Sequence, residues 1–314
     1  MYTEDDSLTY PQLLVVILNY NTTSSTLATV ESVLRQDYRP LQIVVVDNGS
    51  SSDQYEALCR NGGSFHIVRS EENLGYSGGN NLGAKLSILP RPEYVLVLNS
   101  DVILPQPSTF RALVDALEED SARVACSPLV NTLPSNTPVE RQIQVRRIPG
   151  FSTLLVAHSW WLRRLPFLRR LADRSVYADL APLEASRVLV CETINGCCFL
   201  IRRDFLEGIG FFDSGTFLYS EELILGMQIA QRGKATCLVT SAVVDHLQGT
   251  STGHNQRRFR LRMGLEQVRS EVYFCRKYLL VSDVHLVLLL AVRTLDLGTK
   301  AVYQLLLRLR RDSV

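Results

Sequence analysis

Three clusters of polar residues each follow an apolar run that is typical of a buried strand. The runs are LLVVIL, IVVV and YVLVL, and the clusters after them begin at Asn19, Asp47 and Asn99. In open sheets of parallel strands, ligands bind at the carboxyl ends of the strands. The sequence therefore predicts one polar site assembled from three strand ends.

Asp47 opens the segment DNGSSSD. One interpretation is a strand-to-helix turn, because Asp, Asn and Gly adopt turn geometry readily. The other is a nucleotide site, in which the carboxylate accepts the ring N–H of a uracil or thymine base. The residue alone leaves both interpretations open.

Asp101 ends the cluster Asn99-Ser100-Asp101, beside the predicted nucleotide site. A carboxylate there could hold Mg²⁺ or Mn²⁺, because such ions take oxygen ligands and bridge to phosphates. His246 follows the last predicted strand, over 236–244, and could reach the same metal or a diphosphate. The simpler alternatives are a turn or capping role for the aspartate and a structural role for the histidine.

Four glycines fall within the nine residues from 75 to 83. This density indicates close backbone approach or positive φ. The pattern also predicts a helix over 80–89, whose first N–H groups could bind an anion. The spacing matches neither GxGxxG nor the P-loop motif, and a purely structural glycine turn is the alternative.

Glu221 and Glu222 follow the aromatic segment Phe217-Leu218-Tyr219, at the start of a helix predicted over 220–232. Two acids at a helix start can simply complement the helix dipole. The aromatic residues before them favour a pocket instead, where a carboxylate could act as general base on an acceptor hydroxyl.

The elements that must position these residues alternate along the chain. The apolar runs predict parallel strands buried on both faces over 13–18, 42–46 and 94–98. Helical periodicity indicates helices over 22–36 and 108–119, and shorter strands follow over 66–68, 188–190 and 196–201. Alternating strands and helices predict an α/β fold with a mostly parallel sheet.

The segment from Arg141 to Arg170 holds seven arginines, no acidic residue, and the aromatic residues Phe151, Trp160, Trp161 and Phe167. Arginines with interleaved aromatic residues favour an anionic membrane interface or a diphosphate-linked lipid acceptor. A solvated basic insertion with tryptophans in the core is the alternative.

Beyond residue 256 the chain is predicted to be helical and increasingly apolar and basic. This pattern is typical of an amphipathic helix that lies on a membrane surface. Packing against the rest of the chain, or a homo-oligomer formed through these helices, would produce the same pattern.

Composition narrows the protein class. The net charge of the 314 residues is +1, which gives no reason to expect a nucleic-acid partner. Seven cysteines without a CxxC pair predict buried, reduced thiols in a cytoplasmic protein. The acidic N-terminus lacks the apolar run of a signal peptide, and no apolar stretch is long enough to span a membrane.

Taken in this order, the motifs resemble family-2 glycosyltransferases, particularly the bacterial rhamnosyltransferase-like branch. The resemblance covers roughly residues 11 to 280. The matching segments are VVILNYN (15–21), IVVVDNGSSSD (43–53), NLGYSGGNNLG (73–83), YVLVLNSDVIL (94–104), NGCCFLIRRDFLEGIGFFD (195–213), FLYSEELILGMQIAQRGK (217–234) and VVDHLQGTST (243–252).

The resemblance implies the GT-A nucleotide-diphospho-sugar transferase fold, an α/β fold with a mostly parallel central sheet. The catalytic domain would span residues 1–255, followed by a C-terminal helical region over 256–314. Within that domain the resemblance implies a donor-binding half over about 11–130, a basic acceptor-side insertion over about 135–187, and an acceptor and base half over about 188–255.

The resemblance also implies roles for single residues. Asn19, Tyr20, Asn21 and Asp47 would hold the nucleoside, Gly75, Gly79 and Asn80 the ribose and phosphates, and Asn99, Ser100 and Asp101 the strand-end motif. Asp101 and His246 would bind Mg²⁺ or Mn²⁺, and Glu222, with Glu221 beside it, would be the base. Asn99 stands where the family usually has the first acid of the strand-end motif, which is common in this branch. Two positions depart from the family pattern: Glu222 for an aspartate, and Ile224 where a further acid is common.

The implied activity is inverting, metal-dependent transfer from dTDP-rhamnose or a UDP-sugar to a hydroxyl of a glycan or lipid-linked glycan, in cell-surface polysaccharide synthesis. The implied place is the cytoplasm, with peripheral attachment to the inner face of the membrane. A catalytically degenerate nucleotide- or glycan-binding homologue is one alternative. A sugar nucleotidyltransferase is the other, although it would need a basic glycine-rich loop where this chain has NYNTT.

Overall fold

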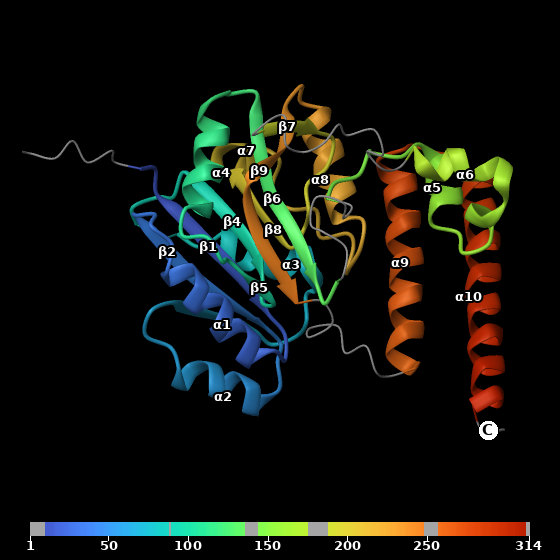
Figure 1. The fold of residues 1–314 in the computed structure, drawn as a ribbon, viewed down its shortest axis with the longest axis horizontal. Coiled ribbons are helices and arrows are strands. Elements are labelled where there is room, and N and C mark those ends of the chain that lie inside the picture. The colour runs from blue at the N-terminus through green and yellow to red at the C-terminus, as the bar shows by residue number, and fades with distance from the viewer. Residues whose placement is uncertain (1–9, 88, 136–143, 175–187, 248–256, 312–314) are drawn as a thin grey trace, which may run out of the picture.

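The computed structural model describes residues 10–87, 89–135, 144–174, 188–247 and 257–311. Within these ranges the strands form one nine-stranded sheet in the order β3-β2-β1-β4-β8-β6-β9-β5, with β7 paired to β9 (Figure 1). The sheet is mixed, because the strands of the first half are parallel and those of the second half pair in both senses.

The first half of the sheet follows the predicted apolar runs. Consecutive Val, Leu and Ile residues lose their solvent exposure on both faces of a parallel sheet, which is why these segments carry no alternation. The register sets Asn19 opposite Asp47 and Leu18 opposite Asn99, so the three polar clusters emerge at one edge. The strands are β1 (Leu13–Asn19), β2 (Leu41–Asn48), β3 (His66–Ser70) and β4 (Tyr94–Asn99).

The second half of the sheet is joined to β4 through an antiparallel strand. β8 lies between β4 and β6, and β6 pairs in parallel with β9. β9 is longer than the predicted strand over 236–244, and its end also pairs with the short β5. The strands are β5 (Val102–Ile103), β6 (Arg123–Leu133), β7 (Val188–Cys191), β8 (Cys198–Arg202) and β9 (Ala235–Leu247).

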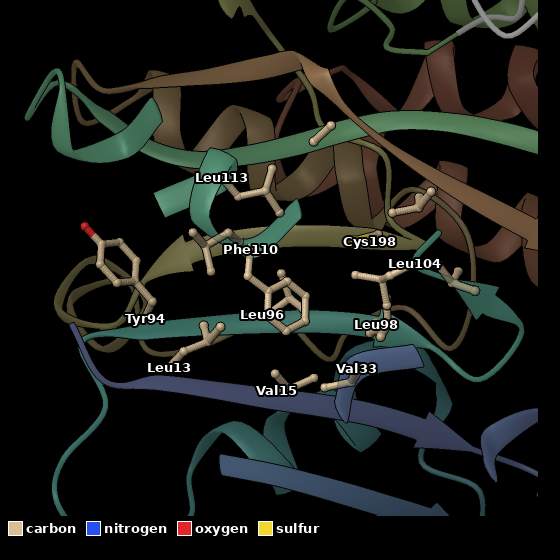
Figure 2. Close-up of a cluster of buried hydrophobic side chains, with 14 of the residues drawn as sticks. Leu13, Val15, Val33, Tyr94, Leu96, Leu98, Leu104, Phe110, Leu113 and Cys198 are labelled. Carbon is tan, nitrogen blue, oxygen red and sulfur yellow. The ribbon is translucent and has the colours of Figure 1, made fainter. Parts of the chain in front are cut away.

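Helices cover both faces of this sheet. On one face α1 and α4 bury Val33, Phe110 and Leu113 against the β1 and β4 side chains (Figure 2). The other face is covered by α3, α7 and α8. The helices are α1 (Thr23–Leu34), α2 (Ser52–Arg60), α3 (Gly75–Ala84), α4 (Thr109–Glu118), α7 (Arg203–Gly208) and α8 (Glu221–Ala230).

The remaining helices stand together at one side of the sheet (Figure 1). We call them the helical group: α5 (Phe151–Ala157), the 3₁₀ helix η2 (Leu162–Arg164), α6 (Pro166–Asp173), α9 (Arg257–Lys277) and α10 (Asp283–Arg311). A hydrophobic cluster joins this group to α8. Its buried members are Leu154, Leu223, Ile224, Phe274, Cys275, Leu286 and Leu289.

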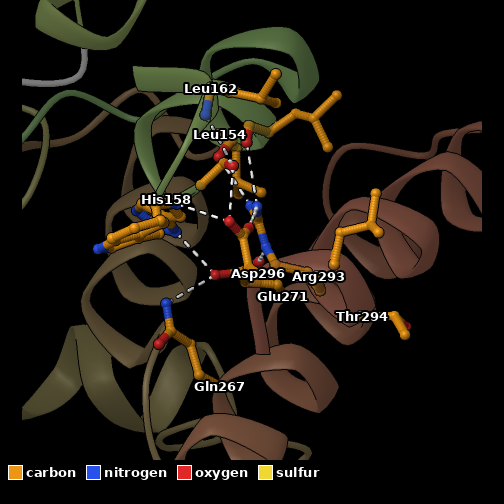
Figure 3. Close-up of polar contacts among 12 residues, drawn as sticks. Leu154, His158, Leu162, Gln267, Glu271, Arg293, Thr294 and Asp296 are labelled. Carbon is orange, nitrogen blue, oxygen red and sulfur yellow. Dashed lines mark hydrogen bonds and ion pairs between the residues drawn. The ribbon is translucent and has the colours of Figure 1, made fainter. Parts of the chain in front are cut away.

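A buried polar cluster ties the insertion to the C-terminal helices (Figure 3). Arg293 on α10 donates to Glu271 on α9 over 2.6 Å and to the carbonyls of Leu154 and Leu155 over 3.1 Å each. Nδ1 of His158 lies 2.9 Å from the second oxygen of Glu271. Burial alone would raise the pKa of Glu271, but the contacts with His158 and Arg293 lower it. The charged groups are paired, so the insertion and the C-terminal helices pack as one unit.

Two expectations need correction. The helix expected over 80–89 begins at Gly75 and ends at Ala84, because the glycine-rich segment itself is helical. All seven cysteines are free thiols, but Cys59 is exposed, so not every thiol is buried as predicted. As expected, no helix in the described ranges is both long and apolar enough to cross a membrane.

Candidate active site

The end of β4 and the end of β9 bring Asp101 and His246 together. Val102 of β5 pairs with His246, and the backbone N–H of Leu247 donates to the Asp101 carbonyl over 2.9 Å. This pairing places His246 Nε2 3.2 Å from Asp101 Oδ1, with the carboxylate buried and the imidazole 15% exposed. Two residues that were predicted to share a metal therefore lie side by side.

The neighbouring floor of the site is a buried hydrogen-bond network. Asn19 donates to Asp47 Oδ1 over 3.0 Å, and its own Oδ1 accepts from Thr26 Oγ1 over 2.8 Å. The other oxygen of Asp47 lies 3.4 Å from Arg69 Nε, because Arg69 on β3 is in register with Asp47. Asn19 therefore holds Asp47 in place, and Arg69 compensates its charge.

The other residues expected to bind the nucleotide lie around this floor. Tyr20 is 39% exposed, so its ring is accessible to a flat ligand. Asn21 has φ of 54° and accepts from the backbone N–H of Ser51 over 2.9 Å, which joins the first two strand ends. Ser100 Oγ shares a 2.9 Å hydrogen bond with Thr22 Oγ1. We call Asn19, Asp47, Ser100, Asp101 and His246 the polar edge.

Two of the first N–H groups of the glycine-rich helix α3 donate to the protein itself. The N–H of Gly75 donates to Asn73 Oδ1 over 2.9 Å and that of Tyr76 to the Phe217 carbonyl over 2.9 Å. A Cβ at Gly79 would come within 2.4 Å of Leu18 Cδ1, so this glycine serves close packing on the sheet. Asn80 is buried and donates to the Tyr76 carbonyl over 3.0 Å.

Glu221 and Glu222 form the first turn of α8 and line a small cavity of about 20 Å³ with Tyr76, Gly196 and Gln228. Burial, and then the charge of Glu222, raise the pKa of Glu221 to about 8. Burial also raises the pKa of Glu222, while the backbone N–H groups of Glu222 itself and of Gly196, and then the charge of Arg146, oppose that rise. Adjacent buried carboxylates share protons at neutral pH, which suits a group that must accept one. We call these two residues the acid pair.

The acid pair follows a loop with an unusual backbone. Tyr219 and Ser220 have φ of 75° and 68°, a left-handed conformation that disfavours residues other than glycine. Helix α9 holds this loop, because Ser270 Oγ donates to the Leu218 carbonyl over 2.7 Å. Earlier in the loop, Asp213 accepts bonds from Tyr273 and Tyr278 and pairs with Lys277 Nζ at 2.7 Å.

The basic insertion reaches the acid pair through one short segment. Arg146 and Thr193 exchange hydrogen bonds of 3.0 and 2.7 Å, which fixes the segment against the loop before β8. The positive charge of Arg146 lowers the pKa of Glu222, and its side chain is exposed to solvent. A charged acceptor would meet this arginine next to the acid pair.

The segment just before β8 lies between the acid pair and the polar edge. The carbonyl of Cys197 accepts from the Asn99 N–H over 2.8 Å, which joins β4 to the segment before β8. Burial, and then the charges of Cys198, Asp101 and Glu222, raise the pKa of the Cys197 thiol. The Gly196-Cys197 segment therefore connects the two regions, because Gly196 lies against Glu222 and Cys197 is bonded to Asn99, two residues before Asp101.

Sequence reasoning gave no site role of their own to Arg69, Tyr76 and Asp213, and it counted Arg146 only among the seven arginines of the insertion. Arg69 could have been found from the strand register, because it occupies the β3 position beside Asp47. Tyr76, Arg146 and Asp213 act through partners that are 120, 47 and 60 or more residues away in sequence. No local pattern signals such contacts.

Two described side chains could act as ligands of a divalent metal. Asp101 and His246 supply one oxygen and one nitrogen at 3.2 Å separation, and no group of three or more metal-ligating side chains occurs within the described ranges. Mg²⁺ is commonly held by one or two carboxylates together with substrate phosphates. The residues therefore fit a metal that is completed by a diphosphate.

The family model described as glycosyl transferase family 2 matches residues 14–182. Among curated proteins, the N-acetylglucosaminyl-diphospho-decaprenol L-rhamnosyltransferase of Mycobacterium tuberculosis is 28% identical over 226 residues, which cover 69% of this chain and 70% of the relative. The low-salt glycan biosynthesis hexosyltransferase Agl10 of Haloferax volcanii is 26% identical over 67% of this chain and 59% of its own length.

Among solved structures, GalNAc-T7 with UDP, GalNAc and Mn²⁺ superposes with a TM-score of 0.56 at 19% identity over 76% of this chain. This chain spans only 44% of that one. The mannosyltransferase PcManGT from Pyrobaculum calidifontis gives a TM-score of 0.54 at 16% identity, over 86% of this chain and 66% of its own. These similarities confirm the expected GT-A fold.

Proposed function

Because this chain belongs to glycosyl transferase family 2, we propose that its polar edge binds a nucleoside diphosphate sugar and that Glu222 activates the acceptor hydroxyl. The chain is a glycosyltransferase similar to rhamnosyltransferases. The observation that carries the proposal is the Gly196-Cys197 segment, because Gly196 lies against Glu222 and the Cys197 carbonyl accepts from Asn99, two residues before Asp101. Asp101 would then act at the leaving group, and Glu222 at the acceptor hydroxyl, of the same sugar transfer.

The proposed reaction is a single in-line displacement. The acceptor oxygen bonds to the anomeric carbon while the bond from that carbon to the diphosphate oxygen breaks, and the hydroxyl proton passes to Glu222. One displacement inverts the anomeric centre and leaves no covalent enzyme intermediate. Glu222 must be deprotonated to act, and the raised pKa of the pair makes it a stronger base than an exposed glutamate.

Asp101 and His246 would hold Mg²⁺ or Mn²⁺. When bound, the metal would neutralise the charge of the diphosphate. The protein itself contributes a preformed site, because pairing of β5 with β9 already holds both side chains together. Ser100, fixed by Thr22, would complete the wall beside the phosphates.

The proposed donor carries a pyrimidine base. Asp47 lies at the floor with Arg69 on one oxygen and Asn19 on the other, and the exposed Tyr20 ring offers a stacking surface. Similarity to an L-rhamnosyltransferase supports dTDP-rhamnose first and a UDP-sugar second. Gly75, Gly79 and Asn80 would act by shaping this wall, because their backbone and side-chain groups contact protein.

The proposed acceptor is a lipid-linked glycan at a membrane surface, in cell-surface polysaccharide synthesis. The M. tuberculosis relative is named for a diphospho-decaprenol acceptor. In this chain the helical group exposes large apolar residues: Phe167 is 75% exposed, Val284 78% and Val287 66%. Exposed apolar patches are typical of surfaces that bind a membrane or another protein. Arg163 and Arg164 add positive charge in η2, which anionic lipid would attract.

Vesicle sedimentation tests the membrane part of this proposal. At low salt the protein should co-sediment with vesicles that contain anionic lipid and not with neutral ones, and Val284→Gln with Val287→Gln should weaken the binding. A protein that stays in the supernatant, and whose mass in light scattering is that of a dimer, would show that the apolar face of α10 contacts a second copy instead.

Thermal-shift binding tests the donor part. The unfolding temperature would be measured with dTDP, UDP and GDP, each with and without Mg²⁺ or Mn²⁺. We expect metal-dependent stabilisation by dTDP or UDP, because a ligand that binds only the folded state raises its stability. Transfer assays with the matching nucleotide sugar follow. A folded protein that responds to no nucleotide would sink the donor proposal.

A further inference from the structure

Tyr76 in the first turn of α3 contacts both loops around the acid pair. Its backbone N–H donates to the Phe217 carbonyl over 2.9 Å, in the loop that leads to Glu221. Its hydroxyl donates to the carbonyl of Gly196, 120 residues further along the chain. One residue of the donor half is thus bonded to both segments that surround Glu222.

Gly196 contacts both the hydroxyl of Tyr76 and the carboxylate of Glu222. Its backbone N–H stabilises the charged form of the Glu222 carboxylate. A Cβ at position 196 would come within 2.7 Å of Glu222 Oε1, so the carboxylate rests directly on the glycine. The peptide that supports Glu222 is therefore next to the carbonyl that Tyr76 fixes.

Within its own helix, the carboxylate of Glu222 is supported by the backbone N–H of Glu222, which favours the charged form. The side chain two residues later is Ile224, which is buried in the hydrophobic cluster with Leu154 and Phe274. Glu221 is adjacent but carries the same charge, and Arg146 acts from the exposed insertion segment. From outside α8, the backbone N–H of Gly196 favours the charged carboxylate, and Gly196 lies directly against it.

We propose that Tyr76 is a positioning residue for the base: its hydroxyl fixes the backbone of Gly196, and that glycine orients the Glu222 carboxylate toward the acceptor. The proposal rests on the proposed function, in which Glu222 is the base. The groups that face Glu222 are Glu221 on α8, Arg146 on the insertion, Tyr76 on α3 and the thiol of Cys197 before β8.

The test compares Tyr76→Phe with Tyr38→Phe. Tyr38 is a matched control, because its hydroxyl also donates to a backbone carbonyl, that of Pro11 over 2.6 Å, at the opposite end of the sheet from the acid pair. Wild type and Glu222→Gln are assayed first with the nucleotide sugar that the thermal-shift series selects. If Glu222→Gln transfers sugar at the wild-type rate, the base assignment of the proposed function fails, whatever Tyr76 does.

If Glu222→Gln proves inactive, the single variant Tyr76→Phe should lower kcat roughly 10- to 100-fold and leave the KM for the donor unchanged. The reason is that a base displaced by a fraction of an ångström loses efficiency. The acidic limb of its kcat profile should move to higher pH, because Gly196 no longer favours the charged carboxylate as strongly. Tyr38→Phe should lower the unfolding temperature but keep the wild-type kcat and the wild-type acidic limb of the pH profile.

A Tyr76→Phe protein with the wild-type kcat and acidic limb would overturn the positioning role and leave the proposed function intact. Gly196→Ala keeps the proposal testable if Tyr76→Phe does not fold. Its added Cβ should displace the carboxylate and cost a similar factor in kcat, while nucleotide diphosphate still raises the unfolding temperature. Full activity of Gly196→Ala would equally contradict the proposal.

Discussion

The polar edge and the acid pair are held in place by different means. At the polar edge, Asn19, Asp47 and Asp101 are fixed by the register of neighbouring strands and by bonds among themselves. The acid pair stands on the first turn of a helix, after a loop with two left-handed residues. Its position depends on contacts from α3, from α9 and from the insertion.

This difference has a consequence for mutation. A change at the polar edge would remove a proposed ligand contact but leave the strand pairing, since backbone hydrogen bonds hold the strands in register. A change among the supports of the acid pair shifts the carboxylates without touching them. We therefore expect effects on donor binding and effects on catalysis to separate between the two regions.

The largest effect is expected for Glu222→Gln set against Glu221→Gln. Glutamine keeps the shape but cannot accept the proton, so Glu222→Gln should lower kcat by roughly 10²- to 10⁴-fold, while Glu221→Gln should cost far less. Both proteins should keep the thermal shift with nucleotide diphosphate, because the polar edge is unchanged. Equal losses in the two variants would mean that the pair acts as one unit.

The same pair predicts a dependence on pH. The folded-state pKa of Glu221 is about 8, above its ordinary value of 4.5, so the folded protein holds an extra proton between these values. Stability should therefore fall as pH rises through this window. Glu221→Gln should flatten that decline in unfolding temperature, and an unchanged slope would contradict the raised pKa.

Asp101→Ala comes next. Loss of this carboxylate should lower kcat by roughly 10²- to 10³-fold and abolish the metal-dependent part of the nucleotide thermal shift. Asp37→Ala is the control, because the side chain of Asp37 forms a surface ion pair with Arg111 at 3.3 Å. If Asp101→Ala retains the metal-dependent shift, the metal is held elsewhere.

The contrast also explains what could be predicted from the sequence. The strands of the first half and their polar ends were predictable, because uninterrupted Val, Leu and Ile runs leave few alternatives to buried parallel strands. Asp101 and His246 were predicted to meet and do so. The missing step was the short β5, whose pairing with β9 needs no apolar run of its own.

The supports of the acid pair could not be predicted in the same way. The contact of Tyr76 with Gly196 joins residues 120 positions apart, and that of Asp213 with Tyr278 joins residues 65 apart. The helix start at Gly75 was misplaced because glycine is a poor helix former, and here packing on the sheet outweighs that propensity. Ile224, which departs from the family pattern, proved to serve hydrophobic packing.

Asp213→Asn should have a smaller effect, confined to the acid-pair side. Burial alone raises the pKa of Asp213, but bonds from Lys277, Tyr278, Gly215 and Tyr273 lower it to about 2. That depressed pKa stabilises the fold above the unfolded value of 3.8, and the stabilisation is lost as pH falls toward 2. The variant should lose about 2 kcal/mol of stability at neutral pH and several-fold in kcat, with the nucleotide thermal shift kept.

Asp204→Asn is the matched control for that variant, because Asp204 pairs with Arg91 at 2.7 Å but is 86% exposed. An exposed ion pair contributes little, so the control should keep the wild-type unfolding temperature and kcat. If Asp213→Asn also weakened nucleotide binding, the two regions would be coupled, and the separation drawn between them would be wrong.

Arg146→Ala should have the smallest effect and the most selective one. The side chain is exposed, so its charge is screened by salt and its influence on Glu222 is modest. Without it the pKa of Glu222 should rise, which moves the acidic limb of kcat to slightly higher pH. If the acceptor carries a diphosphate, the KM for the acceptor should also rise about tenfold at low salt and less at high salt. Arg232→Ala, two residues beyond the end of α8 at Ala230, is the control. An unchanged acceptor KM would mean that the insertion contacts the acid pair without contacting the acceptor.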